Sequence, residues 1–330
     1  MTQTDFRLPA EWEPQSATLL AWPHAASDWA ERLDGIHEEY VALIRAIAAR
    51  QPVVLLVMPG DASAAHELAS LANVHRLELP FDDTWCRDYG PMTLINHAGH
   101  RRALDCLFTG WGGKYPAARD NRVNTLLARQ PLFSRLPFRQ NLFELEGGAI
   151  ECDGNGTLLI NWHCLRTRHA HLSRDEIAFE LRTLLGVERV IGIDIEPLPG
   201  DDTDGHIDTL ARFLAPGILV YQQQSDETRD RRLKSQLEAL RRVDGQPYRL
   251  LALPCPDGVD PALPANYVNF VFVNGACLVP AYGGRADEQA CARLRNALPN
   301  HAVESVPAAV LISQYGGPHC ASMHIPKGRP

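Results

Sequence analysis

The chain has 330 residues and a formal net charge of −8, with 45% hydrophobic and 22% charged residues. This balance is typical of a globular protein that is long enough to bury a core without disulfide or metal staples. The negative charge argues against nucleic acid or an anionic membrane as the main partner, and it suits a small cationic ligand.

The N-terminal segment MTQTDFRLPAEWEPQ has acidic and polar residues where a secretory signal needs a basic start and an apolar stretch. No run approaches the roughly 18 apolar residues of a membrane span. The eight cysteines are scattered without a Cys-x-x-Cys pair, a pattern that fits neither a disulfide framework nor a zinc knuckle. We therefore expect a cytoplasmic protein with mostly buried, reduced thiols.

Segments with helical periodicity alternate with short apolar runs along the chain. Apolar residues spaced three and four apart predict helices, and the short apolar runs predict strands. In chain order these are a helix at Ile36–Arg50, strands at Val53–Met58, Val74–Leu79 and Leu158–Asn161, a helix at Ser173–Leu185, strands at Val187–Ile193 and Ile218–Tyr221, a helix at Glu227–Val243, a strand at Val268–Val273 and a helix at Asp287–Leu298.

Two glycine-containing turns predict β-hairpins. One is Asp153-Gly154-Asn155-Gly156 between two apolar runs, and the other is Asn274-Gly275, which joins NFVFV to ACLVPAY. Ser173, with Glu176 three residues later, predicts a capping box at a helix start. The unit that emerges is a hairpin, a helix and a further strand, repeated with little sequence identity. A mixed α/β fold without an interdomain linker follows.

Polar residues that a core would reject gather in five glycine-rich segments between these elements. The first is WCRDYGP, residues 85–91, which a surface turn with an Arg–Asp salt bridge would also explain. The second is ELEGGAIE, residues 144–151, where two glycines next to Glu146 let the backbone approach another group closely. A simple glycine turn before a strand accounts for this second segment equally well.

The third segment, GDDTDGHID, spans residues 200–208 and holds four carboxylates and one imidazole. Like charges this close repel one another and raise their pKa values unless a cation relieves them. That cation could be a metal ion, an arginine or a substrate.

A metal site is an alternative interpretation of this third segment. His206 and Asp208 could ligate a divalent ion, but no His-Glu-x-x-His or similar ligand spacing is present. We expect no metal and no cofactor. The further histidines that could join such a site are His169, His171, His319 and His324.

The fourth segment is NYVN, residues 266–269, and the fifth is GGPHCAS, residues 316–322. Asn269 is either a pocket-facing amide or an amide satisfied at a strand end. A lone cysteine is most often a small buried hydrophobe. Cys320, however, follows Gly-Gly-Pro-His in a turn, which favours exposure and a neighbour that lowers its pKa. A cysteine with histidines elsewhere in the chain is the usual pattern of a covalent thiol enzyme.

In this order, the five segments resemble the agmatine deiminase family of the guanidine-modifying (pentein) superfamily, related to bacterial-type peptidylarginine deiminases. The resemblance spans nearly the whole chain. Two departures, QYGGP before His319 and the short segment CLRTRHAHLS, touch no candidate catalytic side chain but could reshape a pocket. The matching segments are AEWEPQSATLLAWPH, WCRDYGPM, GWGGKYP, LEGGAIECDGNGTLL, GDDTDGHIDTLARF, YVNFVFVNG and GGPHCASMHIP.

The resemblance implies a single domain over residues 1–330 with the pentein α/β propeller fold. That fold has five ββαβ-type units around a pseudo-fivefold axis, with the active site in the central channel. The implied reaction is hydrolysis of agmatine to N-carbamoylputrescine and ammonia, a step of polyamine biosynthesis. The protein would act in the cytoplasm without a cofactor, and the resemblance is compatible with a homodimer.

The resemblance also implies a role for each matched residue. Cys320 would attack the guanidinium carbon and form a covalent S-amidino intermediate, and His206 would act as the general acid and base. Asp88 and Asp208 would grip the planar N–H edges of the substrate, while Glu146 orients His206. The remaining candidates for substrate binding are Trp85, Trp111, Asn269, Asp202 and Asp204.

Three other functions stay open on the sequence. An amidinotransferase would share the cysteine, histidine and aspartates but pass the amidino group to an amine. A related hydrolase would act on arginine or peptidyl-arginine. A guanidine-binding protein without catalysis is the third alternative, although every matched polar position holds a competent residue.

Overall fold

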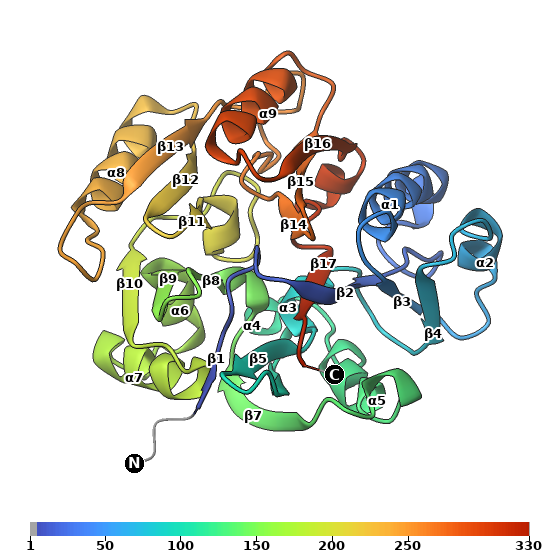
Figure 1. Ribbon diagram of the computed structural model, residues 1–330. Coiled ribbons are helices and arrows are strands. Elements are labelled where there is room, and N and C mark those ends of the chain that lie inside the picture. The colour runs from blue at the N-terminus through green and yellow to red at the C-terminus, as the bar shows by residue number, and fades with distance from the viewer. Residues whose placement is uncertain (1–4, 330) are drawn as a thin grey trace.

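The structure, a computed structural model, describes residues 5–329, and its strands form five small sheets arranged around the middle of the molecule (Figure 1). Each sheet contains an antiparallel pair of strands and a third strand parallel to one of that pair. Helices lie in the chain between the two parallel strands. The predicted hairpin, helix and strand order therefore recurs along the chain.

One sheet joins the two ends of the chain. Strand β17 pairs antiparallel with β2, placing Ser322 opposite Leu20, and β2, β3 and β4 run parallel. This pairing fixes the turn that carries Cys320, since β17 begins two residues later. The elements are β2 (Gln15–Ala21), α1 (Leu33–Ala48), β3 (Val53–Val57), α2 (Ser63–Glu67), β4 (Val74–Glu78) and β17 (Ser322–Pro326).

The second sheet has the order β1-β5-β6-β7. A very short helix, α3, directly precedes β5 and carries Asp88. The elements are β1 (Phe6–Arg7), α3 (Cys86–Tyr89), β5 (Met92–Asn96), β6 (Arg101–Leu107), α4 (Gly110–Gly113), α5 (Val123–Leu127) and β7 (Phe138–Glu144).

The other three sheets have three strands each, in the orders β10-β9-β8, β11-β12-β13 and β14-β15-β16. Their elements are β8 (Ile150–Cys152), β9 (Thr157–Asn161), α6 (Trp162–Arg168), α7 (Arg174–Leu185), β10 (Arg189–Ile193), β11 (Ala211–Ala215), β12 (Ile218–Gln222), α8 (Glu227–Ala239), β13 (Arg249–Leu253), β14 (Val271–Val273), β15 (Ala276–Ala281), α9 (Ala286–Ala297) and β16 (Ala302–Pro307). Short 3₁₀ turns include Gly147–Ala149 and Ile207–Thr209.

The four predicted helices are present as α1, α7, α8 and α9, with ends shifted by a few residues. Ser173 caps α7 and forms the predicted capping box with Glu176. Both predicted hairpins are confirmed, as β8–β9 and β14–β15. Gly154 has a φ of 71°, a left-handed conformation that costs glycine little, so the tight turn between β8 and β9 can form.

Two predicted elements are shorter than expected. The helix predicted to end at Val243 ends at Ala239, because the chain turns around Gly245 and Arg241 bridges to Pro247. The strand predicted from Val268 begins only at Val271. The carbonyl oxygens of Val268 and Phe270 instead accept hydrogen bonds from the buried Arg212 guanidinium, so these backbone groups bind a side chain and not a neighbouring strand.

The inner strands are buried on both faces, which explains why they read as continuous apolar runs. All five residues of β3 and all five of β9 are buried. Helix α1 covers its sheet with an apolar stripe that includes Ile36, Tyr40 and Ile47. None of the helices within residues 5–329 combines the length and apolar character that crossing a bilayer requires.

The five glycine-rich segments occupy equivalent places in the five sheets. Each one directly precedes the first strand of an antiparallel pair: β5, β8, β11, β14 or β17. Segments far apart in the sequence thereby come together, and α3 contacts the 3₁₀ turn Gly147–Ala149, which contacts the 3₁₀ turn Ile207–Thr209. The fold thus brings the candidate site residues to one place.

Candidate active site

Three of the predicted catalytic side chains converge above Gly148. A Cβ atom added to Gly148 would lie 2.5 Å from His206 Nδ1, 3.0 Å from Asp88 Oδ1 and 3.1 Å from Asp208 Oδ2. A side chain at this position would collide with His206 and press against both carboxylates. The glycine therefore allows them to approach one another closely.

Cys320 joins this group through Asp208 and Asn269. Its sulfur lies 3.7 Å from Asp208 Oδ2 and 3.2 Å from Asn269 Nδ2, and the thiol lines a cavity although it is 8% exposed. Burial raises the pKa of Cys320 well above its usual value, and the carboxylates of Asp208 and Asp88 raise it further. Hydrogen bonds with Gly317 and Asn269 lower this pKa but do not outweigh the rise, and His319 faces Asp208 and Glu11 instead of the sulfur.

His206 is buried and held from one side. Its Nε2 lies 3.0 Å from Glu146 Oε2, whereas Nδ1 lies 3.7 Å from Asp88 Oδ1 and has no hydrogen-bond partner. Burial lowers the pKa of His206, but the Asp88 carboxylate and hydrogen bonds with Cys164 and Glu146 outweigh it and raise that pKa well above the usual value. The free nitrogen of this imidazole points toward the other catalytic candidates.

Asp88 is held by two donors. Trp111 Nε1 donates to Oδ2 at 2.9 Å, and the backbone N–H of Gly148 donates to Oδ1 at 2.9 Å. Burial raises the pKa of Asp88 to about 6, and the charges of Glu146 and Asp208 add to the rise while His206 opposes it. The neighbouring Arg87 forms no salt bridge with Asp88 and instead pairs with Glu11, so a simple surface turn does not describe this segment.

Asp208 is fully buried, and one of its two oxygens is free. Its Oδ2 lies 2.7 Å from His319 Nδ1 and 3.3 Å from Asn269 Nδ2, while Oδ1 has no hydrogen-bond partner. Burial raises the pKa of Asp208, but the hydrogen bond and charge of His319 outweigh this and lower the pKa below its usual value. An ionised carboxylate with an unused buried oxygen is suited to a cationic N–H donor.

The cavity at Cys320 is strongly acidic. Asp88 and Cys320 line it, and Asp208 and His206 are buried and contact these two lining residues. No lysine or arginine is among the lining residues. They are Asp28, Asp83, Trp85, Asp88, Trp111, Tyr115, Asp201, Asp202, Thr203, Thr209, Gln314, Tyr315, Gly316 and Cys320.

Both predicted tryptophans line this cavity. Trp111 has a φ of 57°, an uncommon left-handed conformation for a non-glycine residue, and its indole is fixed by the hydrogen bond to Asp88. The ring of Trp85 packs against Gly316, where an added Cβ would lie 2.5 Å from the indole. The unusual QYGGP segment thus contributes directly to the cavity wall, together with Tyr315.

The structure places Asp202 and Asp204 differently from one another. Asp202 lines the cavity and accepts a hydrogen bond from the Tyr115 hydroxyl at 2.7 Å. Asp204 does not line the cavity, because its carboxylate is bound by Lys114 at 2.7 Å and Arg168 at 2.6 Å. Of these two predicted substrate contacts, the structure therefore places Asp202 on the cavity and Asp204 in an ion-paired cluster beside it.

Asn269 also lies outside the cavity lining. Its Oδ1 accepts from the backbone N–H groups of His319 at 3.0 Å and Cys320 at 3.2 Å, and its Nδ2 approaches the Cys320 sulfur. The amide thus fixes the turn that carries the cysteine, and its Nδ2 also lies 3.3 Å from Asp208 Oδ2. The expectation that Asn269 faces the pocket is replaced by a place behind Cys320.

A family model of the Porphyromonas-type peptidyl-arginine deiminases matches residues 7–326. The chain belongs to this family. The agmatine deiminase of Pseudomonas aeruginosa (strain LESB58) is 32% identical over 357 residues, which cover 98% of this chain and 96% of that protein. The predicted family resemblance is therefore confirmed.

Solved structures of relatives share the fold. A C. jejuni agmatine deiminase, solved as a cysteine-to-serine variant with substrate bound, has a TM-score of 0.91 and 32% identity, covering 98% of this chain and 97% of that one. A Porphyromonas gingivalis protein provisionally named an arginine deiminase has a TM-score of 0.88 and 38% identity, covering 98% and 99%. The mixed α/β fold of small sheets is common to this family.

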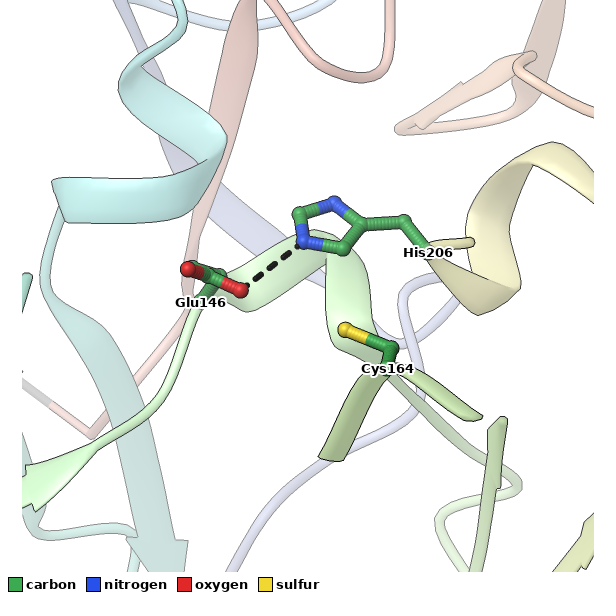
Figure 2. A group of neighbouring side chains, drawn as sticks. All are labelled: Glu146, Cys164 and His206. Atoms are coloured by element: carbon green, nitrogen blue, oxygen red, sulfur yellow. Dashed lines mark hydrogen bonds and ion pairs between the residues drawn. The ribbon is translucent and has the colours of Figure 1, made fainter. Parts of the chain in front are cut away.

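Within residues 5–329, one group of side chains has the geometry of a metal site: Glu146, Cys164 and His206, whose ligand atoms lie within 4.8 Å of one another. Figure 2 shows the imidazole of His206 facing the Glu146 carboxylate with the Cys164 sulfur beside them. Arg168 Nε donates to the same carboxylate at 2.7 Å. A metal ion here would lie next to this guanidinium, which opposes its binding electrostatically.

Four residues around the predicted site residues were not predicted from the sequence: Glu11, Cys164, Arg168 and Arg212. Arg168 bonds to Glu146, Asp204 and the carbonyl of Thr203, which ties the second segment to the third. Arg212 is fully buried and bonds to both Glu11 and Glu151. A usable signal for Arg212 was its place in the apolar run TLARF, where an unpaired charge would be costly to bury.

Proposed function

We propose that this chain is an agmatine deiminase, a hydrolase that converts agmatine to N-carbamoylputrescine and ammonia. One observation carries the proposal: the Cys320 thiol lies in a cavity lined by five aspartates and by no lysine or arginine. Such a cavity suits a substrate that is cationic at both ends. Relatives that are named agmatine deiminases and cover nearly the whole chain support the same conclusion.

In the first half-reaction the guanidinium lies between Asp88 and the free Oδ1 of Asp208. Binding of this cation lowers the pKa of Cys320, whose proton leaves to solvent. The thiolate then attacks the guanidinium carbon, and a C–S bond forms. His206 Nδ1 donates its proton to the departing nitrogen, so the C–N bond breaks, ammonia leaves and an S-amidino intermediate remains.

In the second half-reaction water replaces ammonia. The neutral imidazole of His206 accepts a proton from the water as its oxygen attacks the amidino carbon. The C–S bond breaks, the ureido group gives its extra proton to solvent, and the product leaves as the thiolate is restored. Glu146 and Arg168 hold the other side of this imidazole, so that Nδ1 keeps facing the reacting carbon.

The charge of the cavity favours agmatine over arginine. The α-carboxylate of arginine would enter a space lined by Asp28, Asp83, Asp201 and Asp202 without a basic partner. The nearby Lys114 is already bonded to Asp204 and to the carbonyl oxygen of Asp202. The distal ammonium of agmatine meets no such repulsion.

We therefore expect kcat/KM for agmatine to exceed that for arginine by at least about 100-fold, because like charges brought together cost several kcal/mol. Parallel ammonia assays with agmatine, arginine and an arginyl peptide, without an amine acceptor, measure this ratio. Ammonia release under these conditions also separates hydrolysis from amidino transfer. A preference for arginine or the peptide would contradict the assignment.

A matched pair of variants tests the origin of this preference. Asp202→Asn removes one lining charge and should narrow the ratio between agmatine and arginine. Asp244→Asn removes the same charge from outside the lining, where Asp244 pairs with Arg242, and should leave the ratio unchanged. Equal effects of both variants would mean that net charge alone sets the preference.

Agmatine binding should weaken in acid. Because burial raises the pKa of Asp88 to about 6, its carboxylate becomes neutral as the pH falls through this value and no longer attracts the guanidinium. In a Cys320→Ser background, calorimetric titration between about pH 5 and about pH 8 should show affinity lost at the acidic end. Adding Asp88→Asn should remove that pH dependence. An agmatine affinity that does not change with pH in the Cys320→Ser protein would contradict the prediction.

We further propose an arrangement for the five sheets, a cellular location and a binding partner. The five sheets form the pentein propeller with pseudo-fivefold symmetry and make up one catalytic domain over residues 1–330, as the repeated strand order and the β17–β2 pairing support. A cytoplasmic location is supported by eight unpaired cysteines. We propose the small cationic substrate as the binding partner and propose no nucleic acid or membrane partner. The homodimer follows from the family resemblance.

A further inference from the structure

His319, the residue before Cys320, contacts two carboxylates with its two ring nitrogens. Nδ1 lies 2.7 Å from Asp208 Oδ2, and Nε2 lies 2.7 Å from Glu11 Oε2. The ring is 1% exposed. The backbone of His319 is fixed as well, because its N–H donates to Asn269 and its carbonyl accepts from Arg87 Nε at 3.2 Å.

Asp208, His319 and Glu11 form a row of hydrogen-bonded side chains with a carboxylate at each end. Burial raises the pKa of Glu11, but Arg212, His319 and Arg87 outweigh it and hold that pKa well below its usual value. The pKa of Asp208 is also lowered, against burial, chiefly by its hydrogen bond to His319. Each ring nitrogen of His319 lies 2.7 Å from a carboxylate oxygen, which accepts hydrogen bonds when ionised, so the geometry allows the ring to donate to both.

Glu11 anchors the far end of the row. Its Oε1 accepts from the backbone N–H of Phe272 at 2.8 Å, and its Oε2 accepts from Arg212 at 3.0 Å as well as from His319. At the near end the row immobilises Oδ2 of Asp208 and leaves Oδ1 without a partner. The catalytic carboxylate is thus held in one orientation from behind.

We propose that Glu11 and His319 are positioning residues that fix the orientation of Asp208 and aim its free oxygen at the substrate guanidinium. This inference rests on the proposed function. Neither residue touches the substrate, and both act through Asp208. The pair differs in role from Glu146 and Arg168, which hold His206 on the other side of the reacting carbon.

The kinetic test compares Glu11→Gln, His319→Asn and the double variant, using ammonia release from agmatine. Each single variant should lose about 100-fold in kcat/KM, mostly through a higher KM, because a small misplacement of a binding group has effects of this size. The loss of kcat/KM in the double variant should not exceed the loss in the less active of the two single variants, because both changes break the same row. Additive losses would contradict a shared role.

Glu151→Gln is the matched control. Glu151 is a buried carboxylate that pairs with the same Arg212 but does not contact His319. It should keep kcat/KM close to that of wild type, and thermal unfolding of every variant shows which of them are folded. Equal losses in Glu11→Gln and Glu151→Gln would show that the buried network only stabilises the fold, and would overturn the proposal.

A spectroscopic measurement separates this inference from the proposed function. In ¹⁵N NMR of the histidine side chains, His319 should show two protonated ring nitrogens at neutral pH, with the signal assigned by its loss in His319→Asn. A single protonated nitrogen in the wild-type protein would overturn the positioning role even if agmatine is hydrolysed. Absence of ammonia release with a doubly protonated His319 would instead refute the agmatine deiminase assignment alone.

Discussion

Replacement of Cys320 by serine is expected to abolish ammonia release from agmatine while agmatine binding persists. A serine hydroxyl in this buried, acidic cavity is a far poorer nucleophile than a thiolate, so the rate should fall by at least about a thousandfold. Asp88 and Asp208 remain in place to bind the guanidinium. An ammonia assay gives the loss of turnover, and calorimetric titration with agmatine gives the retained binding.

Cys152→Ser is the control for this first prediction. Cys152 is buried, and its sulfur donates to the carbonyl of Leu8 at 3.3 Å and accepts from the backbone N–H of Gly154 at 3.4 Å, two roles that a serine hydroxyl can also fill. It lies outside the cavity lining and should retain the wild-type rate. If Cys320→Ser kept more than a few per cent of that rate, another residue would have to be the nucleophile.

Replacement of His206 by asparagine should block both halves of the reaction. Without the imidazole, no group donates a proton to the departing ammonia and none accepts one from water, so turnover should fall by about 100- to 10,000-fold. The shorter asparagine side chain does not reach the position of Nε2 and loses the contact with Glu146, so thermal unfolding must show that the variant is folded. Rapid-quench measurements should show that neither ammonia nor a covalent adduct forms at the wild-type rate.

His37→Asn provides a comparison for this second prediction. His37 is also a buried histidine, bonded through Nε2 to the carbonyl of Pro23 at 2.8 Å, and it does not line the cavity. Its replacement should affect stability more than the rate of a folded sample. Wild-type turnover in His206→Asn would remove the general acid and base from the mechanism.

The sequence predicted the location of the site because its residues lie in glycine-rich turns rather than in apolar elements. Each of the five segments precedes the first strand of an antiparallel pair, and so short-range signals marked positions that the fold makes equivalent. Gly148 illustrates the reason. Its lack of a side chain, visible in the sequence as Gly-Gly beside Glu146, is required by the three groups that crowd around it.

The partners that hold these residues could not be predicted in the same way. Glu11 contacts His319 across 308 positions of the chain and Arg212 across 201. A single glutamate between an alanine and a tryptophan carries no local signal of such a contact. His319, considered as a metal ligand from its residue type, is instead occupied by two carboxylates.

Residue type also could not show which of the predicted substrate contacts line the cavity. Asp204 was one of four carboxylates in a short segment, but Lys114 and Arg168 from other parts of the chain neutralise it. Asn269 was expected at a pocket or a strand end, and it supports the Cys320 turn through two backbone donors. Only the folded chain shows which polar groups are already satisfied.

Mass spectrometry of the protein quenched with acid during its first turnover of agmatine tests the central claim most directly. The account predicts that the peptide containing Cys320 gains the mass of agmatine less that of ammonia, and that this gain disappears as the product forms. Ammonia release with an unmodified Cys320 peptide, or the same gain on a different cysteine, would contradict it.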